Sequence, residues 1–260
     1  MTLNQTAFRS LSSLTQLAML SILTYSEDIP VSIIPSSVKT LEIRMTGVFG
    51  REMVTIPDTI ESLKLSGYQM TRVNTLPTSI TKLVLDKPSL FNMSVPITLP
   101  SNVQEFTFIL GYIHLDVKYI EFLYPPNLRF IDFSHQGVPY KPTNIPTSVS
   151  EFKYQVLNIL VHSVGDDDGL IFLSTLKKLS VHMDIVRGID RCWVLQLNYV
   201  INQTSVETLV IEAFHFQVDI RRRLDGQNRN VLIVGKSLNG GIMHQQIVQR
   251  IEEMKKISLF

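Results

Sequence analysis

The chain has 260 residues, of which 45% are hydrophobic and 18% are charged, with 24 Lys and Arg against 23 Asp and Glu. This length supports one large domain or two small ones with a sizeable core, and the chain lacks the long charge blocks that mark disorder or polyelectrolyte tails. The net charge of +1 argues against a dedicated nucleic-acid binder, and the single cysteine, Cys192, excludes an internal disulfide framework and a Cys-rich zinc site.

The N-terminal segment is the first with a regular pattern. Apolar residues recur at helical spacing between Phe8 and Leu23, which predicts an amphipathic helix as a cap within residues 1–30. Polar residues interrupt the apolar stretch, which does not suit a signal peptide. Since no run approaches the ~20 apolar residues needed to span a bilayer, we expect a cytoplasmic protein without a membrane partner.

A repeat extends over residues 31–215. Eight copies share a six-residue pattern, apolar-x-x-apolar-x-apolar, which we call the hexad and whose residues we number 1 to 6, with position 7 following it. The hexads begin at Val38, Ile60, Ile80, Val103, Leu128, Val149, Leu176 and Val206, at spacings of 22, 20, 23, 25, 21, 27 and 30 residues. Positions 4 to 6 alternate as in a strand with one buried face, so the period is near 22 residues with one strand in each copy.

A turn signature precedes each hexad. Proline stands three residues before the hexad in six copies, at Pro35, Pro57, Pro77, Pro100, Pro125 and Pro146. A small polar residue directly precedes all eight hexads, namely Ser37, Thr59, Ser79, Asn102, Asn127, Ser148, Thr175 and Ser205. These residues either start local turns or form a ladder through the stack that satisfies buried turn groups, and the sequence leaves both alternatives open.

A single copy cannot fold alone. Burying its three apolar side chains contributes at best ~5–9 kcal/mol, whereas ordering its backbone costs at least ~20 kcal/mol. Stacking solves this, because each copy offers a strand edge and an apolar face to the next. The sequence therefore predicts a solenoid of stacked parallel strands.

The repeat is similar to that of a known family. Copies such as IPSSVKTLEI at Ile34–Ile43 follow the pattern [IL]-P-x-[ST]-[VI]-x-x-L-x-[LIF], which resembles the FNIP repeat, and Phe91-Asn92 matches the Phe-Asn of the family name. FNIP repeats are leucine-rich-repeat-like units of social amoebae and some giant viruses. The resemblance covers about residues 30–245 and implies a leucine-rich-repeat-like solenoid that acts as an interaction protein. Many members carry an N-terminal F-box-like segment, but a full F-box does not fit before the first repeat here.

The C-terminal region, residues 216–260, is predicted to close the solenoid. Phe214–Arg223 and Asn230–Gly235 have the pattern of two strands joined by a turn at Asp225-Gly226. Apolar residues from Ile242 to Met254 recur at helical spacing and predict a closing helix. A further helix is expected over Gly188–Ile201, and no linker divides the chain, which indicates one domain.

Several motifs for catalysis or ligand binding are weak. Val231–Ser237 ends in Gly-Lys-Ser but has Asn230 where a phosphate-binding loop needs glycine, so a capping strand and turn is the better interpretation. Asp166–Asp168 lacks the ligand spacing of a calcium loop and is interpreted as a solvated loop, although cation binding there stays open. His162, His182 and the pair His114/Asp116 define no metal site, and we expect no cofactor.

Two further candidates have simpler explanations. The apolar neighbours of Cys192 favour a buried, inert thiol over a nucleophile. Arg221–Arg223 is a dense basic run, but in an alternating strand its side chains point both ways, so we expect no nucleic-acid partner.

The strand face is the remaining candidate for function. Positions 3, 5 and 7 of the eight hexads hold 24 residues, with five positive and six negative charges. This mixture suits a protein partner, with these residues as the predicted contacts: Phe130, Ile109, Val84, Lys64, Asp132 and Lys153. We therefore predict a noncatalytic protein–protein interaction module or subunit of a larger assembly. The alternatives are an ordinary mixed surface with contacts elsewhere, a β-helix enzyme acting on carbohydrate, and, from the resemblance, a substrate receptor for ubiquitin ligation.

Overall fold

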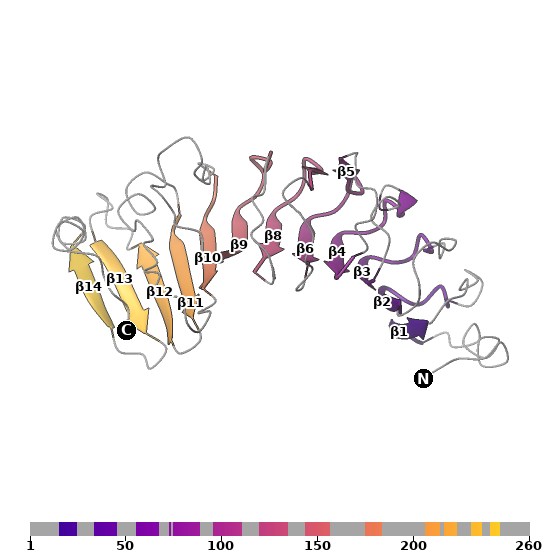
Figure 1. Cartoon of the computed structure of the whole chain (residues 1–260), viewed down its shortest axis with the longest axis horizontal. Helices are drawn as coiled ribbons and strands as arrows, with labels where there is room; N and C mark the ends of the chain where they lie inside the picture. Colours follow the sequence, from indigo (N-terminus) through magenta and orange to yellow (C-terminus); the bar gives the residue numbers. More distant parts are fainter. Residues whose placement is uncertain are drawn as a thin grey trace. The chain divides into compact units, whose positions relative to one another are not determined.

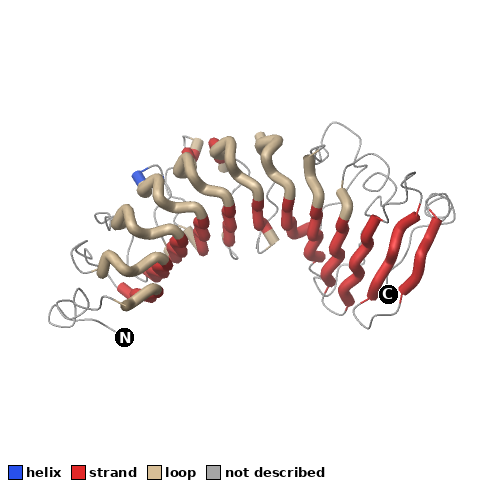
Figure 2. Tube along the Cα trace, turned by 180° about the vertical axis from the view of Figure 1, so that it is seen from behind, coloured by secondary structure: helices blue, strands red, loops and turns tan. Residues whose placement is uncertain are grey.

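The fold was analysed in a computed structural model. It describes residues 16–24, 34–45, 56–67, 73, 75–88, 96–110, 120–134, 144–156, 175–183, 206–213, 216–222, 230–235 and 240–244. These residues form a parallel-strand β-solenoid with almost no helix, extended at its C-terminal end by antiparallel strands (Figures 1 and 2). The chain divides into two compact units, Met1–Ile131 with Pro142–Pro146, and Asp132–Lys141 with Thr147–Phe260.

The first unit is a stack of parallel strands, one for each coil. Its main sheet has the order β1 (Met19–Thr24), β2 (Thr40–Met45), β3 (Ser62–Ser66), β4 (Lys82–Asp86), β6 (Glu105–Ile109) and β8 (Phe130–Phe133), whose last two residues belong to the second unit. Position 4 aligns from strand to strand, since Leu41 pairs with Leu63 and Leu63 with Leu83. The prediction that the hexads run side by side in the same direction is confirmed.

The hexads supply the core of both units. Every apolar residue at positions 1, 4 and 6 of the eight predicted hexads is buried, and the most exposed of them, Ile211, is 8% exposed. The residues between them alternate outward, as in β4, where Leu83 and Leu85 are buried and Val84 is half-buried. Each coil therefore buries its apolar face against its neighbours, which is how a unit too small to fold alone is stabilised.

The backbone joins successive coils in a repeated way. The carbonyl of position 2 accepts two hydrogen bonds from the next coil, from the N–H groups of its positions 2 and 3. Lys39, for example, accepts from Glu61 at 2.9 Å and from Ser62 at 3.0 Å. In the second unit, Ser150 accepts in the same way from Lys177 and Lys178. This contact fixes the register at the point where each strand begins.

The proline segments form turns, as predicted. In five coils of the first unit the proline carbonyl accepts from the N–H of hexad position 1, with Pro35–Val38 at 3.0 Å, Pro57–Ile60 at 3.1 Å, Pro77–Ile80 at 3.4 Å, Pro100–Val103 at 3.2 Å and Pro125–Leu128 at 3.2 Å. Proline is at the first position of these turns, where its carbonyl is the group required. The turn thus directs the chain from the apolar residue before proline into the strand.

The polar residues before the hexads bridge coils. Ser37 Oγ donates to the carbonyl of Leu17 at 2.8 Å, Ser79 Oγ to that of Ile60 at 2.8 Å, and Asn102 Nδ2 to that of Thr78 at 2.8 Å. In the second unit, Thr175 Oγ1 donates to the carbonyl of Val149 at 3.3 Å. The ladder alternative therefore holds at these four positions, although Asn102 and Thr175 are exposed. Thr59 differs, because its buried Oγ1 has no hydrogen-bond partner.

A second sheet of two short strands forms on the other side of the first unit. Here β5 (Ile97–Thr98) pairs in parallel with β7 (Phe122–Leu123). Phe122 packs with its ring centroid 5.1 Å from those of Phe106 and Phe108, in edge-to-face geometry. The aromatic cluster ties this small sheet to β6 of the main sheet.

The second unit continues with parallel strands and ends with antiparallel ones. Its strands are β9 (Glu151–Val156), β10 (Lys178–Met183), β11 (Thr208–Ala213), β12 (Phe216–Arg222), β13 (Asn230–Gly235) and β14 (Gly240–His244). The pairs β9–β10 and β10–β11 are parallel, and the three later pairs are antiparallel. The two strands predicted near Phe214–Arg223 and Asn230–Gly235 are confirmed as β12 and β13.

The predicted terminal helices need correction. Gln16–Ala18 are not helical and Met19–Thr24 is strand β1, so the helix expected between Phe8 and Leu23 is wrong from Gln16 onward, because pairing with β2 overrides the local helical spacing. Gly240–His244 is likewise a strand, which is inconsistent with a helix beginning at Ile242. The helix expected over Gly188–Ile201 and the remainders of the other two lie outside the described residues.

A ninth hexad, which was not predicted from the sequence, precedes the other eight. Leu17, Leu20 and Ile22 occupy positions 1, 4 and 6 of a coil before Val38, with Leu20 paired to Leu41 and Ile22 to Ile43. The carbonyls of Leu17 and Ala18 accept the ladder and strand-start bonds of the next coil, from Ser37 and Lys39 respectively. The spacing apolar-x-x-apolar-x-apolar was present in the sequence. However, Leu14 stands three residues before this hexad, where six other copies have proline, so the turn signature was absent.

Candidate functional site

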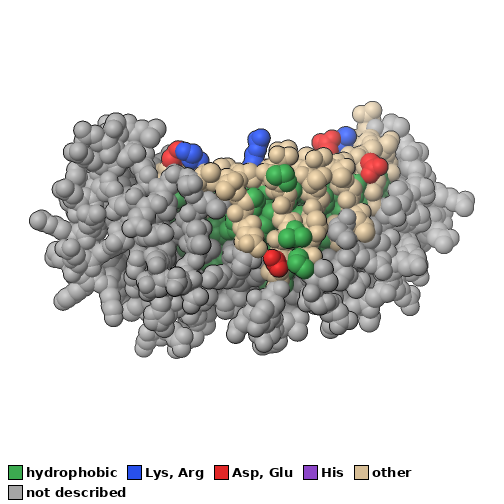
Figure 3. All heavy atoms as spheres, turned by 90° about the horizontal axis from the view of Figure 1, so that it is seen from above, with side chains coloured by type: hydrophobic (Ala, Val, Ile, Leu, Met, Phe, Trp, Pro, Cys, Tyr) green, Lys and Arg blue, Asp and Glu red, His purple; other side chains and the backbone are tan. Residues whose placement is uncertain are grey.

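The exposed face of the strands is the candidate site. It consists of hexad positions 3, 5 and 7, which are presented outward because successive side chains of a strand alternate between two faces, together with position 2, which precedes the strand and is half-buried or exposed. Most of these side chains are half-buried or exposed, and the buried exceptions include Ser66, Asp132, Gln155 and Ser180. On the face shown in Figure 3, acidic and basic side chains lie next to one another at two places along the border of the described surface.

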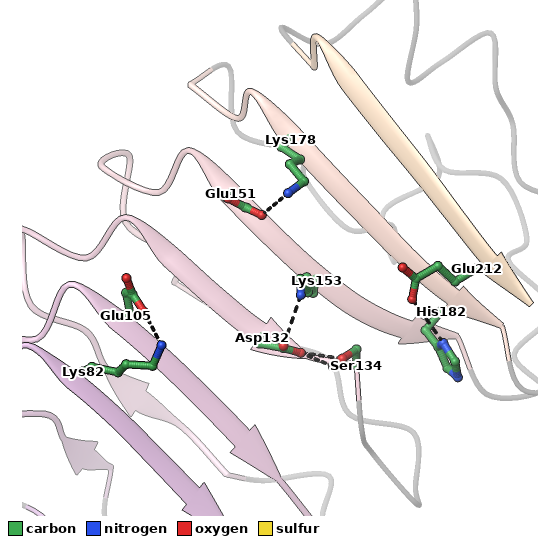
Figure 4. A network of polar contacts seen from close by, with 9 residues as sticks. All are labelled: Lys82, Glu105, Asp132, Ser134, Glu151, Lys153, Lys178, His182 and Glu212. Carbon is green, nitrogen blue, oxygen red and sulfur yellow. Dashed lines mark hydrogen bonds and ion pairs between the residues drawn. The ribbon is translucent and has the colours of Figure 1, made fainter. Parts of the chain in front are cut away.

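Charges on the first unit pair across neighbouring strands. Lys39 Nζ lies 2.9 Å from Glu61 Oε1, Lys64 Nζ lies 3.1 Å from Glu42 Oε1, and Lys82 Nζ lies 2.9 Å from Glu105 Oε2. In each pair both residues hold the same hexad position, in adjacent coils. Figure 4 shows the Lys82–Glu105 pair bridging β4 and β6. Such pairs stabilise the register modestly, by about 0.2–1 kcal/mol each.

The second unit repeats the arrangement. Lys178 pairs with Glu151, Lys177 Nζ lies 2.7 Å from Glu207 Oε1, and Lys153 Nζ lies 3.8 Å from Asp132 Oδ2. His182 Nδ1 lies 3.7 Å from Glu212 Oε2, also at one hexad position (Figure 4). The carboxylate of Asp132 is further held by the N–H of Ser134 at 2.9 Å and by the Ser134 hydroxyl at 2.5 Å.

Glu42 is the carboxylate with the most cationic contacts on this face. The ammonium of Lys64 and the guanidinium of Arg44, 3.2 Å away, lower the pKa of Glu42 below its usual value, with the Lys64 hydrogen bond as the largest cause. Burial opposes this effect without cancelling it. Glu42 is therefore held ionised, which suits an ion pair and does not suit a general acid.

An uncharged patch remains between the paired charges of the first unit. Val84 pairs directly with Thr107 across β4 and β6, and Ile109 follows two residues later on the same face of β6. All three side chains are half-buried. The Lys82–Glu105 pair lies on one side, and on the other the Ser66 hydroxyl donates to Asp86 Oδ2 at 3.1 Å. We call Val84, Thr107 and Ile109 the uncharged patch.

The predicted contact residues divide into two groups. Val84 and Ile109 belong to the uncharged patch, and Phe130 begins β8, where its N–H donates to Gln104 at 3.1 Å. Lys64 is engaged with Glu42, and Asp132 and Lys153 are engaged with each other in the second unit. A comparison of the residues at one hexad position in successive coils shows opposite charges one coil apart. This signal would have predicted the Lys64–Glu42 and Lys153–Asp132 pairs from the sequence.

The weaker motifs have the following places. His182 is on β10, paired with Glu212, and Arg221 and Arg222 are on β12. The strand of Val231–Ser237 is β13, whereas Lys236 and Ser237 lie outside the described residues. The same holds for these residues: His114, Asp116, His162, Asp166–Asp168, Cys192 and Arg223. Within the described ranges, no three His, Cys, Asp or Glu side chains gather as a metal-ion site.

The fold defines the class of this protein as a parallel β-solenoid. Comparison with family models, with curated proteins and with solved structures gave no match for this chain. The resemblance to the FNIP repeat therefore stays a prediction. A search of the described residues for a helix long and apolar enough to cross a membrane found none.

Proposed function

We propose that this chain is a leucine-rich-repeat-like, noncatalytic interaction module that binds a protein partner through the strand face of its first unit. The observation that carries the proposal is the uncharged patch between the Lys82–Glu105 pair and the Ser66–Asp86 hydrogen bond. An apolar centre bordered by polar groups is the usual composition of a protein–protein interface. Val84 and Ile109 would be the apolar side chains that contact the partner. Phe130, at the start of β8 on the next coil, would be a third contact.

The satisfied charges support a protein partner. A surface whose lysines and carboxylates already neutralise one another gives little attraction to a polyanion, so nucleic acid is not the expected ligand. A folded protein surface can match the mixed border and fill the apolar centre. The FNIP resemblance and a cytoplasmic location remain part of this proposal.

The test is partner capture with matched variants. The tagged full chain is used for affinity purification and mass spectrometry alongside the variant Val84→Arg/Ile109→Arg, whose substitutions are on half-buried positions of the outer face. Leu123→Glu, on β7 of the second sheet, is the control, because Leu123 is 47% exposed and lies outside the strand face. We expect a stoichiometric partner that the control retains and the double variant loses. A partner retained equally by both variants would contradict the proposed face.

The enzyme alternative is less well supported. Glycoside hydrolysis needs two carboxyl groups, one of which must stay protonated as an acid. In the strand pairs β2–β3, β3–β4, β4–β6, β9–β10 and β10–β11, the carboxylates at positions 3, 5 and 7 lie directly across from a cation, a hydroxyl or an uncharged side chain. The ubiquitin-ligation alternative rests on the resemblance, and it predicts an adaptor among the captured proteins.

A further inference from the structure

The N-terminal end of the main sheet differs from its interior. In the described part of the chain, β1 is the last strand at this end, and only β2 pairs with it. Leu17 and Leu20, at positions 1 and 4, are only half-buried, whereas these positions are buried in the other eight hexads. Met19, at 59% exposed, is one of two exposed large hydrophobic residues among those described.

Among the described residues, nothing pairs with the backbone groups on the edge of β1 that faces away from β2, which we call the free edge. In interior coils the N–H groups of positions 2 and 3 donate to the preceding coil, but among the described residues no acceptor faces those of Ala18 and Met19. The carbonyl of Ala18 points to β2, and backbone groups alternate sides along a strand. The N–H and C=O groups of Met19, Ser21 and Leu23 therefore point to the free edge.

This edge lacks the devices that usually prevent strands from associating. Proline and charged side chains protect sheet edges, and β1, with the sequence MLSILT, has neither. The interior strands differ, because β2, β3, β4 and β6 each carry charged residues on the strand face. An edge without charge meets no electrostatic repulsion from an identical edge.

We propose that β1 is a homodimerisation edge, at which two copies of this chain pair their β1 strands antiparallel about a two-fold axis at Ser21. The symmetry places Met19 opposite Leu23 of the second copy on the strand face. It places Leu20 opposite Ile22 of the second copy on the core face. Because Met19, Ser21 and Leu23 all point to the edge, this register forms about six N–H···O=C bonds. On both faces an apolar residue then lies opposite an apolar residue of the second copy, and the half-buried Leu20 becomes more buried.

The occupant is a second copy because the strand is complementary to itself. Reversal of MLSILT about Ser21 exchanges Met19 with Leu23 and Leu20 with Ile22, so each apolar residue meets an apolar residue of the same face. An isologous interface requires this property. The surface is separate from the uncharged patch, which lies on β4 and β6, so the dimer leaves the proposed partner site open.

The first test is the mass of the full chain in solution. We expect sedimentation or light scattering over a concentration series to give twice the monomer mass of 29.6 kDa. Ser21→Pro removes the edge-directed N–H groups at the axis and leaves the side bonded to β2 intact, so it should give a monomer with an unchanged circular dichroism spectrum. Leu123→Glu, the control, should remain dimeric.

A second series of variants tests the proposed register between the two β1 strands. It does not require that β1 remain folded with a proline in it. Met19→Glu and Leu23→Lys are each expected to weaken the dimer at least tenfold, because each places an unpaired charge against an apolar residue. The double variant Met19→Glu/Leu23→Lys should recover dimerisation, since the two charges meet across the axis, and salt should weaken it. Val84→Arg/Ile109→Arg should dimerise normally, which separates this proposal from the proposed function.

Three results would overturn the proposal. The first is a wild-type chain that is monomeric at every concentration. This result would mean that the edge of β1 is covered by another segment of the chain or pairs with a strand of a different protein. The second is a dimer unaffected by Ser21→Pro and Met19→Glu, which must form through another surface. The third is failure of the double variant to recover, which would exclude the proposed register.

Discussion

The two ladder residues Ser79 and Thr59 hold equivalent places in adjacent coils but should respond in opposite ways to loss of the hydroxyl. Ser79 Oγ donates to the carbonyl of Ile60 at 2.8 Å in a half-buried site. Removing it in Ser79→Ala should destabilise the chain by about 1 kcal/mol, the net contribution of such a bond. The Oγ1 of Thr59 is buried without a partner. Thr59→Val removes this desolvated group while keeping the shape, and should stabilise by about 1 kcal/mol.

The assay is urea unfolding followed by circular dichroism. The expected difference between the two variants is about 2 kcal/mol, or roughly a 30-fold difference in the unfolding equilibrium constant, at an unchanged m-value. Asn102→Leu is a useful third variant, because the exposure of Asn102 should keep its loss near 0.5 kcal/mol. If Thr59→Val destabilised the chain as much as Ser79→Ala, the ladder would not be the source of the stabilisation.

Three further predictions concern burial and pH. Leu83 is fully buried, so Leu83→Asp should prevent cooperative folding, and a normal thermal melt would contradict the position of Leu83 in the core. Because the folded-state pKa of Glu42 is lowered, the ionised side chain stabilises the fold above its unfolded-state pKa of 4.5, and this stability is lost as the pH falls through the lower folded-state pKa. Glu42→Gln should therefore destabilise the chain at pH 7 and match the wild type in strong acid. Burial raises the pKa of Tyr154 to about 12, so stability should fall between about pH 10 and pH 12, and Tyr154→Phe should remove this alkaline loss in pH-dependent urea titrations; an equal loss in the variant would refute it.

The strands of the solenoid were predictable because the hexad is a local pattern with a fixed outcome. Position 4 and position 6 alternate around one outward residue, and proline marks the turn before them, as at Pro77 and Ile80. The first coil was not predicted to be a strand because Leu17 and Leu20 also fit helical spacing, and because Leu14 stands where proline would have indicated a turn. Only pairing with β2, a contact between distant residues, decides between strand and helix there.

The small sheet and the charge pairs were harder to predict for different reasons. The strands β5 and β7 have two residues each, which is too short for any periodicity to be visible. Lys64 and Glu42 were identified as separate surface charges, since nothing within one coil indicates that they pair. Their partnership depends on the register between coils, which places Glu42 directly across from Lys64.

The most direct test of the stacked register is disulfide trapping between β2 and β3. Thr40 and Ser62 are direct partners at hexad position 3, and a disulfide requires Cα atoms no more than about 7 Å apart. In a Cys192→Ser background, Thr40→Cys/Ser62→Cys should form an intramolecular disulfide on mild oxidation, detected by mass spectrometry. Thr40→Cys/Lys64→Cys, which is displaced by two residues, should stay reduced. Efficient bridging in the displaced pair but not in the direct pair would contradict the parallel, in-register stack.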